Sequence, residues 1–358
     1  MNVLSTDDYR VNTSKKTAQF ELLIGLKKRG VNIIVVSLFS NEILQKFKDA
    51  DITCIEDFPE SKIDLNYVKN IKKYVEEYKI DIIHAFHGKA LRNTILAVKK
   101  SPIKLITYMG SSSIHWHDPS AYFTYLSPRI DKIICNSNYV YEHVKKQLFG
   151  KRKQKAIKIF KGYNPDWFSN IQPFDFSTLG IDKNATVVCF AADYLKVKGV
   201  EYYIKSTYHI DTKQNIHFIL LGDMRGNKDV PKLIKNSPLK NNIHALGSRK
   251  DAISFFKAAD IYVQTSKREG FGRAISEAMC LKKPIIMTNA GGCTELIDEH
   301  SGIVVPVKQP KAIAEAIVKL AQNKELSKKM GENAFVRINE KFHIDKTIQE
   351  TLELYKSL

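Results

Sequence analysis

One stretch decides the fold, Ser266–Met279, which reads SKREGFGRAISEAM. A β-branched run, Ile261–Gln264, ends just before it, and a helical pattern begins near Arg273. The glycines Gly270 and Gly272 suit a tight turn in which the backbone approaches a ligand closely. A strand, turn and helix in this order direct free backbone amides out of a helix N-terminus, which favours the binding of an anion.

Two more units of this kind lie in the same half of the chain. Ala191–Val200 follows a predicted strand and carries Lys198 just before Gly199, where a lysine can reach a phosphate as a point charge. Thr288–Glu295 is again a strand end, a glycine pair and a helical pattern. Any one of them is typical of an ordinary strand-to-helix corner, but three in order predict a shared site.

Short β-branched runs alternate with amphipathic stretches along the whole chain. The predicted strands are Asn2–Leu4, Asn32–Ser37, Asp81–Ala85, Leu105–Tyr108 and Lys132–Cys135, then Thr186–Phe190, His217–Leu221, Asn242–Leu246, Ile261–Gln264, Pro284–Thr288 and Gly302–Val305. The predicted helices include Thr17–Lys28, Leu65–Tyr78, Asn138–Leu148, Ala252–Ala258, Arg273–Leu281 and Pro310–Asn323. This alternation predicts two parallel sheets covered by helices. Ligands of such sheets bind at the carboxyl ends of the strands, so we expect a site in the cleft between two domains.

Two segments fall outside the alternation. Asn164–Asn184 has no clean periodicity and is interpreted as the connection between the domains. The helical pattern Thr347–Leu358 has no strand of its own to cover, so it must dock on a structure that is already formed.

Composition narrows the class of protein. The 358 residues are 44% hydrophobic and 26% charged, as in soluble globular proteins, and no apolar stretch approaches the ~18 residues that span a bilayer. The N-terminus runs at once into Asp7 and Asp8, so we expect no signal peptide. The five cysteines form no Cys-x-x-Cys pair, which favours a reducing cytoplasm over a disulfide framework or a zinc site.

The net charge is +18, and the first half is the more basic one. Residues 1–170 hold 28 basic and 17 acidic side chains, giving +11, and residues 171–358 hold 28 and 21, giving +7. Such a surface attracts nucleic acid, anionic lipid or phosphorylated metabolites. A solvated, lysine-rich surface without a partner explains the count equally well.

Taken together, the motifs closely resemble family 4 retaining glycosyltransferases. The resemblance rests on the Glu269-x7-Glu277 spacing, on Pro284–Ile297 (PIIMTNAGGCTELI) and on Ser301–Pro306 (SGIVVP). Further matching stretches are Lys198–Ile204, Leu246–Asp251, Ala258–Val263, Tyr125–Ser137 and Lys161–Asn164.

The resemblance implies an α/β GT-B fold, in which two Rossmann-like doubly wound domains face each other across a cleft. Residues 1–170 would form the N-terminal, acceptor-side domain and residues 171–340 the nucleotide-sugar-binding domain. Residues 341–358 would form a helix that crosses back to the first domain. It also implies transfer with retention of anomeric configuration, with the nucleotide sugar as a substrate and without a cofactor. No DxD-type metal motif lies near these residues, and fixed positive charge makes a metal ion unnecessary, so we expect none.

Donor-side roles carry over residue by residue. Glu269 and Lys198 would be catalytic, the first on the donor sugar and the second on the diphosphate, and Glu277 would bond the ribose hydroxyls. The whole implied donor site is Lys196, Lys198, Ser248, Arg249, Glu269, Gly270, Phe271, Gly272, Arg273 and Glu277. The family carries an arginine before its phosphate lysine, and here Lys196, Arg268 or Arg273 would substitute for it, with Lys196 preferred.

The acceptor side departs from the family pattern. Where relatives have a Gly-Gly loop after the first strand, this chain reads Val11–Lys16, and Lys15 or Lys16 would contact phosphate instead. Where many relatives have a His-Gly pair, this chain has Met109-Gly110. The acceptor-side candidates are therefore Lys15, Lys16, His84, His87, Gly110, His115 and His117.

We therefore expect a hexosyltransferase-type enzyme of the cytoplasm that moves a sugar onto a glycan or lipid-linked acceptor for cell-envelope polysaccharides such as lipopolysaccharide. Basic clusters at Lys69–Lys73 and Lys145–Lys161 favour peripheral association with an anionic membrane surface, on the inner face of the plasma membrane. The alternatives are a nucleotide-sugar epimerase of the same fold and a weak partner subunit that binds anionic surfaces. No motif indicates specific binding of nucleic acid.

Overall fold

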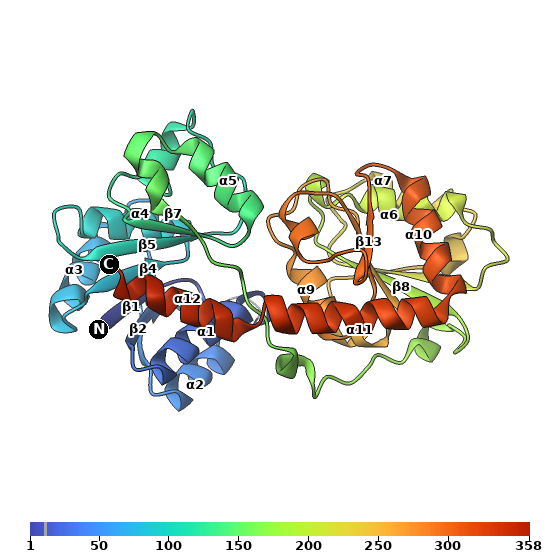
Figure 1. Ribbon diagram of the computed structural model, residues 1–358, viewed down its shortest axis with the longest axis horizontal. Helices are drawn as coiled ribbons and strands as arrows, with labels where there is room; N and C mark the ends of the chain where they lie inside the picture. Colours follow the sequence, from blue (N-terminus) through green and yellow to red (C-terminus); the bar gives the residue numbers. More distant parts are fainter. Residues whose placement is uncertain (11–12) are drawn as a thin grey trace. The chain divides into compact units, whose positions relative to one another are not determined.

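A computed structural model describes residues 1–10 and 13–358, with side chains from Lys16 onward in the second stretch. The chain forms two compact units (Figure 1). The first comprises Met1–Gly162 together with Ile344–Leu358, and the second comprises Tyr163–His343. Within the described residues, no helix is both long and apolar enough to cross a membrane.

The first unit is a parallel sheet with helices packed on it. Its strands are β1 (Asn2–Thr6), β2 (Asn32–Ser37), β3 (Thr53–Glu56), β4 (Ile82–Ala85), β5 (Lys104–Met109), β6 (Lys132–Cys135) and β7 (Ala156–Lys158). Its α-helices are α1 (Thr13–Lys28), α2 (Asn41–Asp49), α3 (Leu65–Glu77), α4 (Gly88–Ala97), α5 (Asn138–Gln147) and α12 (Ile344–Lys356), and η1 (Pro119–Phe123) and η2 (Gly150–Lys155) are 3₁₀ helices. Among the described residues the strand order is β3-β2-β1-β4-β5-β6-β7.

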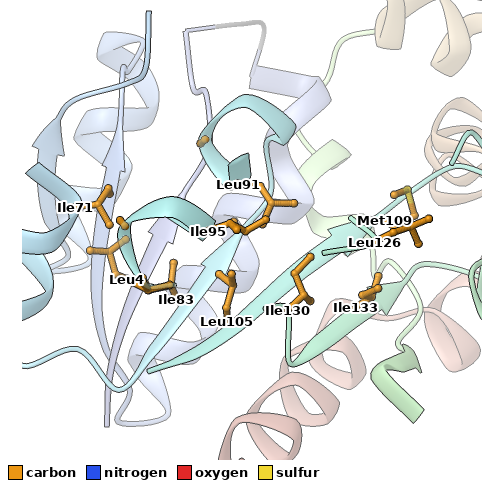
Figure 2. Close-up of a cluster of buried hydrophobic side chains, with 14 of the residues drawn as sticks. Leu4, Ile71, Ile83, Leu91, Ile95, Leu105, Met109, Leu126, Ile130 and Ile133 are labelled. Atoms are coloured by element: carbon orange, nitrogen blue, oxygen red, sulfur yellow. The ribbon is translucent and has the colours of Figure 1, made fainter. Parts of the chain in front are cut away.

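The core of this unit follows from the apolar character of its central strands. Leu4 on β1 pairs in register with Ile34 on β2 and Ile83 on β4, and all three side chains are buried. Ile71 of α3 and Leu91 of α4 pack over this face of the sheet (Figure 2). Strands that are buried on both faces read as continuous apolar runs, which is why the sequence predicts them well.

The second unit repeats the design. Its strands are β8 (Thr186–Ala191), β9 (Ile216–Leu221), β10 (Ile243–Gly247), β11 (Ile261–Gln264), β12 (Ile285–Thr288) and β13 (Gly302–Val305). Its α-helices are α6 (Val200–Ser206), α7 (Asp229–Lys235), α8 (Ala252–Ala258), α9 (Arg273–Cys280), α10 (Pro310–Gln322) and α11 (Lys324–Lys341). Its 3₁₀ helices are η3 (Pro165–Phe168), η4 (Phe176–Leu179), η5 (Lys196–Lys198), η6 (Thr207–His209), η7 (Lys240–Asn242) and η8 (Gly292–Glu295).

The strand order of the second sheet is β10-β9-β8-β11-β12-β13, all parallel. The order reverses between β8 and β11, so the connections that leave these two strands diverge to opposite sides. Such a reversal opens a crevice at the carboxyl ends of the strands, where ligands of doubly wound sheets bind. The three predicted turns follow β8, β11 and β12, so they lie around this point.

The boundaries between the units differ from the predicted ones. The first unit ends at Gly162 rather than at residue 170, and it resumes at Ile344 rather than at residue 341. The segment interpreted as a connection, Asn164–Asn184, is folded onto the second unit, since the Phe174 ring stacks on Phe255 of α8 at 3.9 Å between centroids. Aromatic residues of this segment pack against the second unit. The sequence did not indicate this, because the segment has no periodic pattern.

The C-terminal helix α12 belongs to the first unit and packs along α1. Gly25 of α1 leaves room for Ile348, since a Cβ at residue 25 would lie 2.2 Å from Cδ1 of Ile348. Asp345 pairs with Arg29 at 2.9 Å. The helix thus covers an apolar face of the first unit, as the absence of a strand of its own required.

Candidate functional site

Hydrogen bonds join the turn after β11 to the turn after β8. The hydroxyl of Thr265 donates to the carbonyl of Gly199 at 2.8 Å, and the amide of Lys267 donates to the carbonyl of Val197 at 2.6 Å. The two turns are therefore held at a fixed distance.

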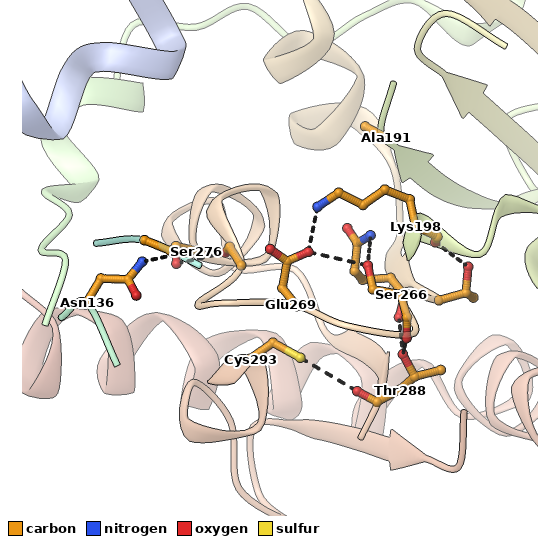
Figure 3. A network of polar contacts seen from close by, with 12 residues as sticks. Asn136, Ala191, Lys198, Ser266, Glu269, Ser276, Thr288 and Cys293 are labelled. Carbon is orange, nitrogen blue, oxygen red and sulfur yellow. Dashed lines mark hydrogen bonds and ion pairs between the residues drawn. The ribbon is translucent and has the colours of Figure 1, made fainter. Parts of the chain in front are cut away.

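The turn after β11 is joined equally closely to the turn after β12. The amide of Glu269 donates to the carbonyl of Ala290 at 2.7 Å, and the amide of Gly292 donates back to the carbonyl of Glu269 at 2.9 Å. The Thr288 hydroxyl donates to the Ser266 carbonyl (Figure 3). The three turns that the sequence singles out thus form one hydrogen-bonded layer at the edge of the sheet.

Two glycines make this close approach possible. Gly199 has a φ of 65°, and a Cβ at that position would lie 2.1 Å from the carbonyl oxygen of Thr265. Gly272 precedes α9 with a φ of 110° and lies against Ile275 and Leu296. Larger residues at these two positions would be strained, and at Gly199 they would push the turns apart.

Within this layer Lys198 and Glu269 form an ion pair. Nζ of Lys198 lies 2.6 Å from Oε2 of Glu269, and the Ser266 hydroxyl donates to the same oxygen at 3.3 Å (Figure 3). Both side chains remain partly exposed, at 28% for Lys198 and 15% for Glu269. A cation and a carboxylate therefore lie side by side at the edge of the sheet, within reach of solvent.

Glu277 lies on α9, one turn after Arg273. Its side chain is almost fully buried, and its Oε1 accepts a hydrogen bond from Nη1 of Arg273 at 2.9 Å. A buried carboxylate is costly unless a charged partner compensates it, and the guanidinium supplies that partner. Phe271, also buried, packs its ring edge-on against Phe342 at 5.6 Å.

The remaining donor-side candidates lie outside this hydrogen-bonded layer, either in solvent or after β10, the outermost strand on one side of the sheet. Lys196 is exposed in η5. The Ser248 hydroxyl, after β10, lies 3.5 Å from Oδ1 of Asp193, and Arg249 forms a bidentate pair with Asp251 at 2.9 and 2.8 Å. A pocket of about 650 Å³ lies beside Ser248, between α7 and the ends of β9 and β10. Its lining includes Gly222, Asp223, Met224, Val230 and Ile234.

Of the two acceptor-side lysines, the structure describes the side chain of Lys16 only. Lys16 is bound within the first unit, with its Nζ 2.6 Å from Oδ1 of the buried Asp7. Burial raises the pKa of Asp7, and Lys16 opposes that rise. The side chain of Lys15 lies outside the described residues, as do Val11 and Asn12, so that part of the candidate set stays a prediction.

The histidines predicted on the acceptor side do not form one cluster. His84 lies in the core of the first unit rather than at a ligand-accessible edge, and its Nδ1 is 2.7 Å from the Tyr355 hydroxyl of α12. Burial lowers the pKa of His84 to about 3, so the ring is neutral. The sequence missed this because β4 is buried on both faces, so that even its polar residue is enclosed.

The other histidines lie at the carboxyl-end loops of the first sheet. His87 is half-buried and accepts a hydrogen bond from the Lys89 amide at 3.3 Å, which caps α4. Burial lowers its pKa. His115 and His117 stack at 5.2 Å in the loop after β5, and His115 also contacts the ring of His143 on α5. Gly110, at the end of β5, accepts a hydrogen bond from the Asn136 side chain at 3.4 Å.

Among the residues that the structure describes, no group of three or more His, Cys, Asp or Glu side chains is arranged to hold a metal ion. The site offers fixed positive charge, from Lys198 and from the backbone amides before α9, beside the carboxylates of Glu269 and Glu277. The positive charge can bind phosphate oxygens, and the carboxylates can accept hydrogen bonds from pairs of hydroxyl groups.

Comparisons with known proteins agree with this arrangement. The glycosyl transferases group 1 model matches residues 171–337, and the Glycosyltransferase Family 4 model matches residues 18–166. An uncharacterized glycosyltransferase of Methanocaldococcus jannaschii is 30% identical over 305 residues, which are 82% of this chain and 80% of that protein.

A second relative and a solved structure are more specific in their names. The N,N'-diacetylbacillosaminyl-diphospho-undecaprenol alpha-1,3-N-acetylgalactosaminyltransferase of Campylobacter jejuni is 30% identical over 161 residues, 44% of this chain and 41% of that protein. Anabaena HepE, solved in complex with UDP-glucose, superposes with a TM-score of 0.81 at 20% identity and 100% coverage of both chains. The likeness confirms the predicted GT-B architecture of two Rossmann-like units, and with the family matches it shows that this chain is a member of glycosyltransferase family 4.

Proposed function

We propose that this glycosyltransferase moves a sugar, with retention of configuration and without a metal ion, from a nucleotide-sugar donor to a glycan or lipid-linked acceptor of the cell envelope. One observation carries the proposal. The turns after β8, β11 and β12 are hydrogen-bonded into one layer that presents Lys198 and Glu269 together. A nucleoside diphosphate sugar needs such a combination of a cation for its diphosphate and a carboxylate for its hydroxyls.

The donor would extend along the edge of the second sheet. Lys198 and the exposed Lys196 would bind the diphosphate, together with the backbone amides of Gly270, Phe271, Gly272 and Arg273. Glu269 would accept hydrogen bonds from the sugar, and Glu277 would accept them from the ribose. The base would lie near Ser248 and Arg249, where the adjoining pocket of about 650 Å³ has the volume of a small-molecule site.

The chemistry follows from the charges. The bond between the anomeric carbon and the diphosphate breaks, and its electron pair leaves with the phosphate oxygen. Lys198 stabilises the charge that develops there, and so does the N-terminal end of α9. The acceptor oxygen bonds to the anomeric carbon on the same face, and its proton passes to the departing phosphate. This route needs no carboxylate nucleophile and no metal ion.

Names of relatives support the substrate classes. HepE was solved with UDP-glucose, which supports a nucleotide sugar as the donor. The Campylobacter transferase carries a diphospho-undecaprenol-linked sugar in its name, which supports a lipid-linked acceptor. A cytoplasmic enzyme fits both, because nucleotide sugars are charged and do not cross membranes unaided.

A thermal-shift screen of UDP-, GDP-, ADP- and CMP-sugars tests the donor. A ligand at 100 times its dissociation constant stabilises the fold by about 2.7 kcal/mol. Stabilisation by at least one nucleotide sugar, reduced in Glu277→Ala, supports the proposal, and no stabilisation by any of them contradicts it. Retention is then tested by NMR, from the anomeric configuration of the first product formed.

A further inference from the structure

The first unit carries an exposed aromatic pair. Trp116, in the loop after β5, is 53% exposed, and Phe149, which follows α5, is 54% exposed. The two rings meet edge to face at 6.1 Å between centroids. Two large aromatic side chains placed side by side in solvent are unusual for a surface without a partner, since their burial would be favourable.

The pair is held in place by its surroundings. The amide of Trp116 donates to Oε1 of Gln147 at 3.0 Å, and Nε2 of His143 donates to the carbonyl of Ile114 at 2.7 Å. Both acceptor and donor side chains come from α5, so the loop that carries Trp116 is pinned to that helix. The aromatic rings are therefore presented on a fixed platform, and ordering them on a partner costs little entropy.

The residues around the pair are strongly basic. Between residues 143 and 161 the chain has eight basic side chains and no acidic one, namely Lys145, Lys146, Lys151, Arg152, Lys153, Lys155, Lys158 and Lys161. Lys146, Lys151 and Lys153 are exposed. Aromatic rings beside lysines are the combination that anionic bilayer surfaces bind, since the rings enter the headgroup region while the charges face the lipid phosphates.

Not every basic residue of the run is available. Arg152 donates to the carbonyl of Leu126, and Nζ of Lys155 donates to the carbonyls of Pro128 and Ile130 at 2.8 and 2.6 Å. These two side chains fix η2 to the loop before β6. Ile159, among the apolar residues of the run, is buried in the core. Lys146, Lys151 and Lys153, which are exposed and near Phe149 in the chain, carry surface charge beside the aromatic pair. Lys158 is also exposed, with its Nζ 5.2 Å from the centroid of the Phe160 ring. The sequence could not separate these lysines from Arg152 and Lys155, which serve the fold.

We infer that Trp116 and Phe149, with Lys146, Lys151 and Lys153, form a docking surface for an anionic lipid bilayer. We call this surface the aromatic–lysine patch. The inference rests on the proposed function in one respect, because docking on a bilayer would bring the enzyme to a lipid-linked acceptor. The binding itself needs neither donor nor acceptor. Two weak signals, apolar insertion and charge, act together, as stable peripheral attachment requires.

Vesicle binding tests the patch on the full-length protein. The probes are vesicles of phosphatidylcholine alone and of phosphatidylcholine with phosphatidylglycerol, and the readout is co-sedimentation as salt is raised. The chain has two tryptophans, so Trp167→Phe leaves Trp116 as the single tryptophan, which is excited selectively at wavelengths that tyrosine does not absorb. We expect binding to anionic vesicles only, weakened by salt, with a blue shift of Trp116 emission and quenching by brominated lipid.

Matched variants separate the patch from general charge. Lys151→Gln with Lys153→Gln should weaken binding about 30-fold, since each basic residue near an anionic leaflet contributes about 1 kcal/mol and 1.4 kcal/mol is tenfold. Lys99→Gln with Lys100→Gln removes the same charge from exposed positions elsewhere and should have a far smaller effect. Trp116→Ser with Phe149→Ser should weaken binding about tenfold or more, whereas Ile63→Ser with Leu65→Ser, also exposed, should not.

The outcomes decide between the explanations. No binding of the unaltered protein to anionic vesicles at low salt overturns the inference. Binding that survives the aromatic change also overturns it, because the surface would then attract any polyanion. Vesicle binding of the Trp167→Phe protein without a shift of Trp116 emission overturns it as well, since Trp116 would then not enter the bilayer. Stabilisation by nucleotide sugars is measured separately on the same variants. If that stabilisation is absent while vesicle binding follows the patch, the proposed function fails and the docking surface stands.

Discussion

Nζ of Lys198 and Oε2 of Glu269 lie 2.6 Å apart, although the two side chains come from turns after different strands, β8 and β11. If Lys198 binds the diphosphate and Glu269 the sugar, as we propose, each has to exchange its present partner for part of the donor. The donor then replaces one ion pair by two charge-assisted contacts. The turns that carry the two side chains are hydrogen-bonded to each other, so on this assignment the exchange is made by side chains on a fixed backbone.

Lys198→Ala should reduce kcat about 100-fold while changing donor affinity much less, because the charge on the leaving phosphate grows in the transition state. Steady-state kinetics with the best donor of the thermal-shift screen measure both. Lys183→Ala, at an exposed position, is the control. An unchanged kcat with a raised KM would show that Lys198 binds only the ground state.

Glu277→Ala should weaken nucleotide binding by about 1.5–3 kcal/mol, since the ribose hydroxyls lose a charged acceptor. Calorimetry with the free nucleoside diphosphate measures this without turnover. The variant also leaves Arg273 without its partner at 2.9 Å, so its thermal stability has to be recorded alongside. Glu315→Ala, an exposed glutamate on α10, is the control. Unchanged affinity in a folded Glu277→Ala protein would contradict the ribose role.

Transfer should proceed in EDTA at the rate seen with added magnesium. The physical reason is that, in the proposed site, Lys198 and the amides before α9 would supply the positive charge for the diphosphate. The comparison is made on protein dialysed against chelator, with readdition of magnesium and manganese as separate arms. Complete loss of activity that either ion restores would sink this prediction.

Stability should fall as the pH drops from about 7 to about 5, and His84 should account for about 2 kcal/mol of that fall. Its pKa is about 3 in the folded protein and 6.5 in the unfolded chain, so below pH 6.5 the unfolded state binds the extra proton. The contribution is therefore complete above pH 6.5 and is lost toward pH 3. Denaturant unfolding at a series of pH values gives the free energy of unfolding of the native protein and of His84→Asn as a function of pH. An equal fall of this free energy between pH 7 and 5 in both proteins would show that His84 does not titrate this way.

The sequence predicts most of the strands because their apolar runs are continuous and bounded by turns. It predicts the three glycine turns for a different reason. Gly199 and Gly272 are required there by a backbone geometry that few other residues adopt. α11 was not predicted as an element. Its buried residues are partly small, with Gly331 and Ala334 among them, so its apolar stripe is weak.

What escaped prediction depends on contacts between residues far apart in the chain. The partner of His84 is Tyr355, and the partner of Lys155 is a pair of carbonyls in the loop before β6. Neither pairing leaves a local pattern. The same holds for Trp116, whose loop is pinned by Gln147 of the following helix. The sequence therefore does not distinguish a histidine or lysine that stabilises the fold from one that binds a ligand.

Because α12 completes the first unit from the far end of the chain, the two units cannot be finished in the order in which they are synthesised. Tyr163–His343 is contiguous, so all of it is synthesised before α12. The first unit meanwhile has its sheet but lacks Ile348 over Gly25 and Tyr355 beside His84. During translation that face of α1 is therefore apolar surface without its cover, and such transiently exposed surface makes a nascent chain prone to aggregation until α12 packs on it.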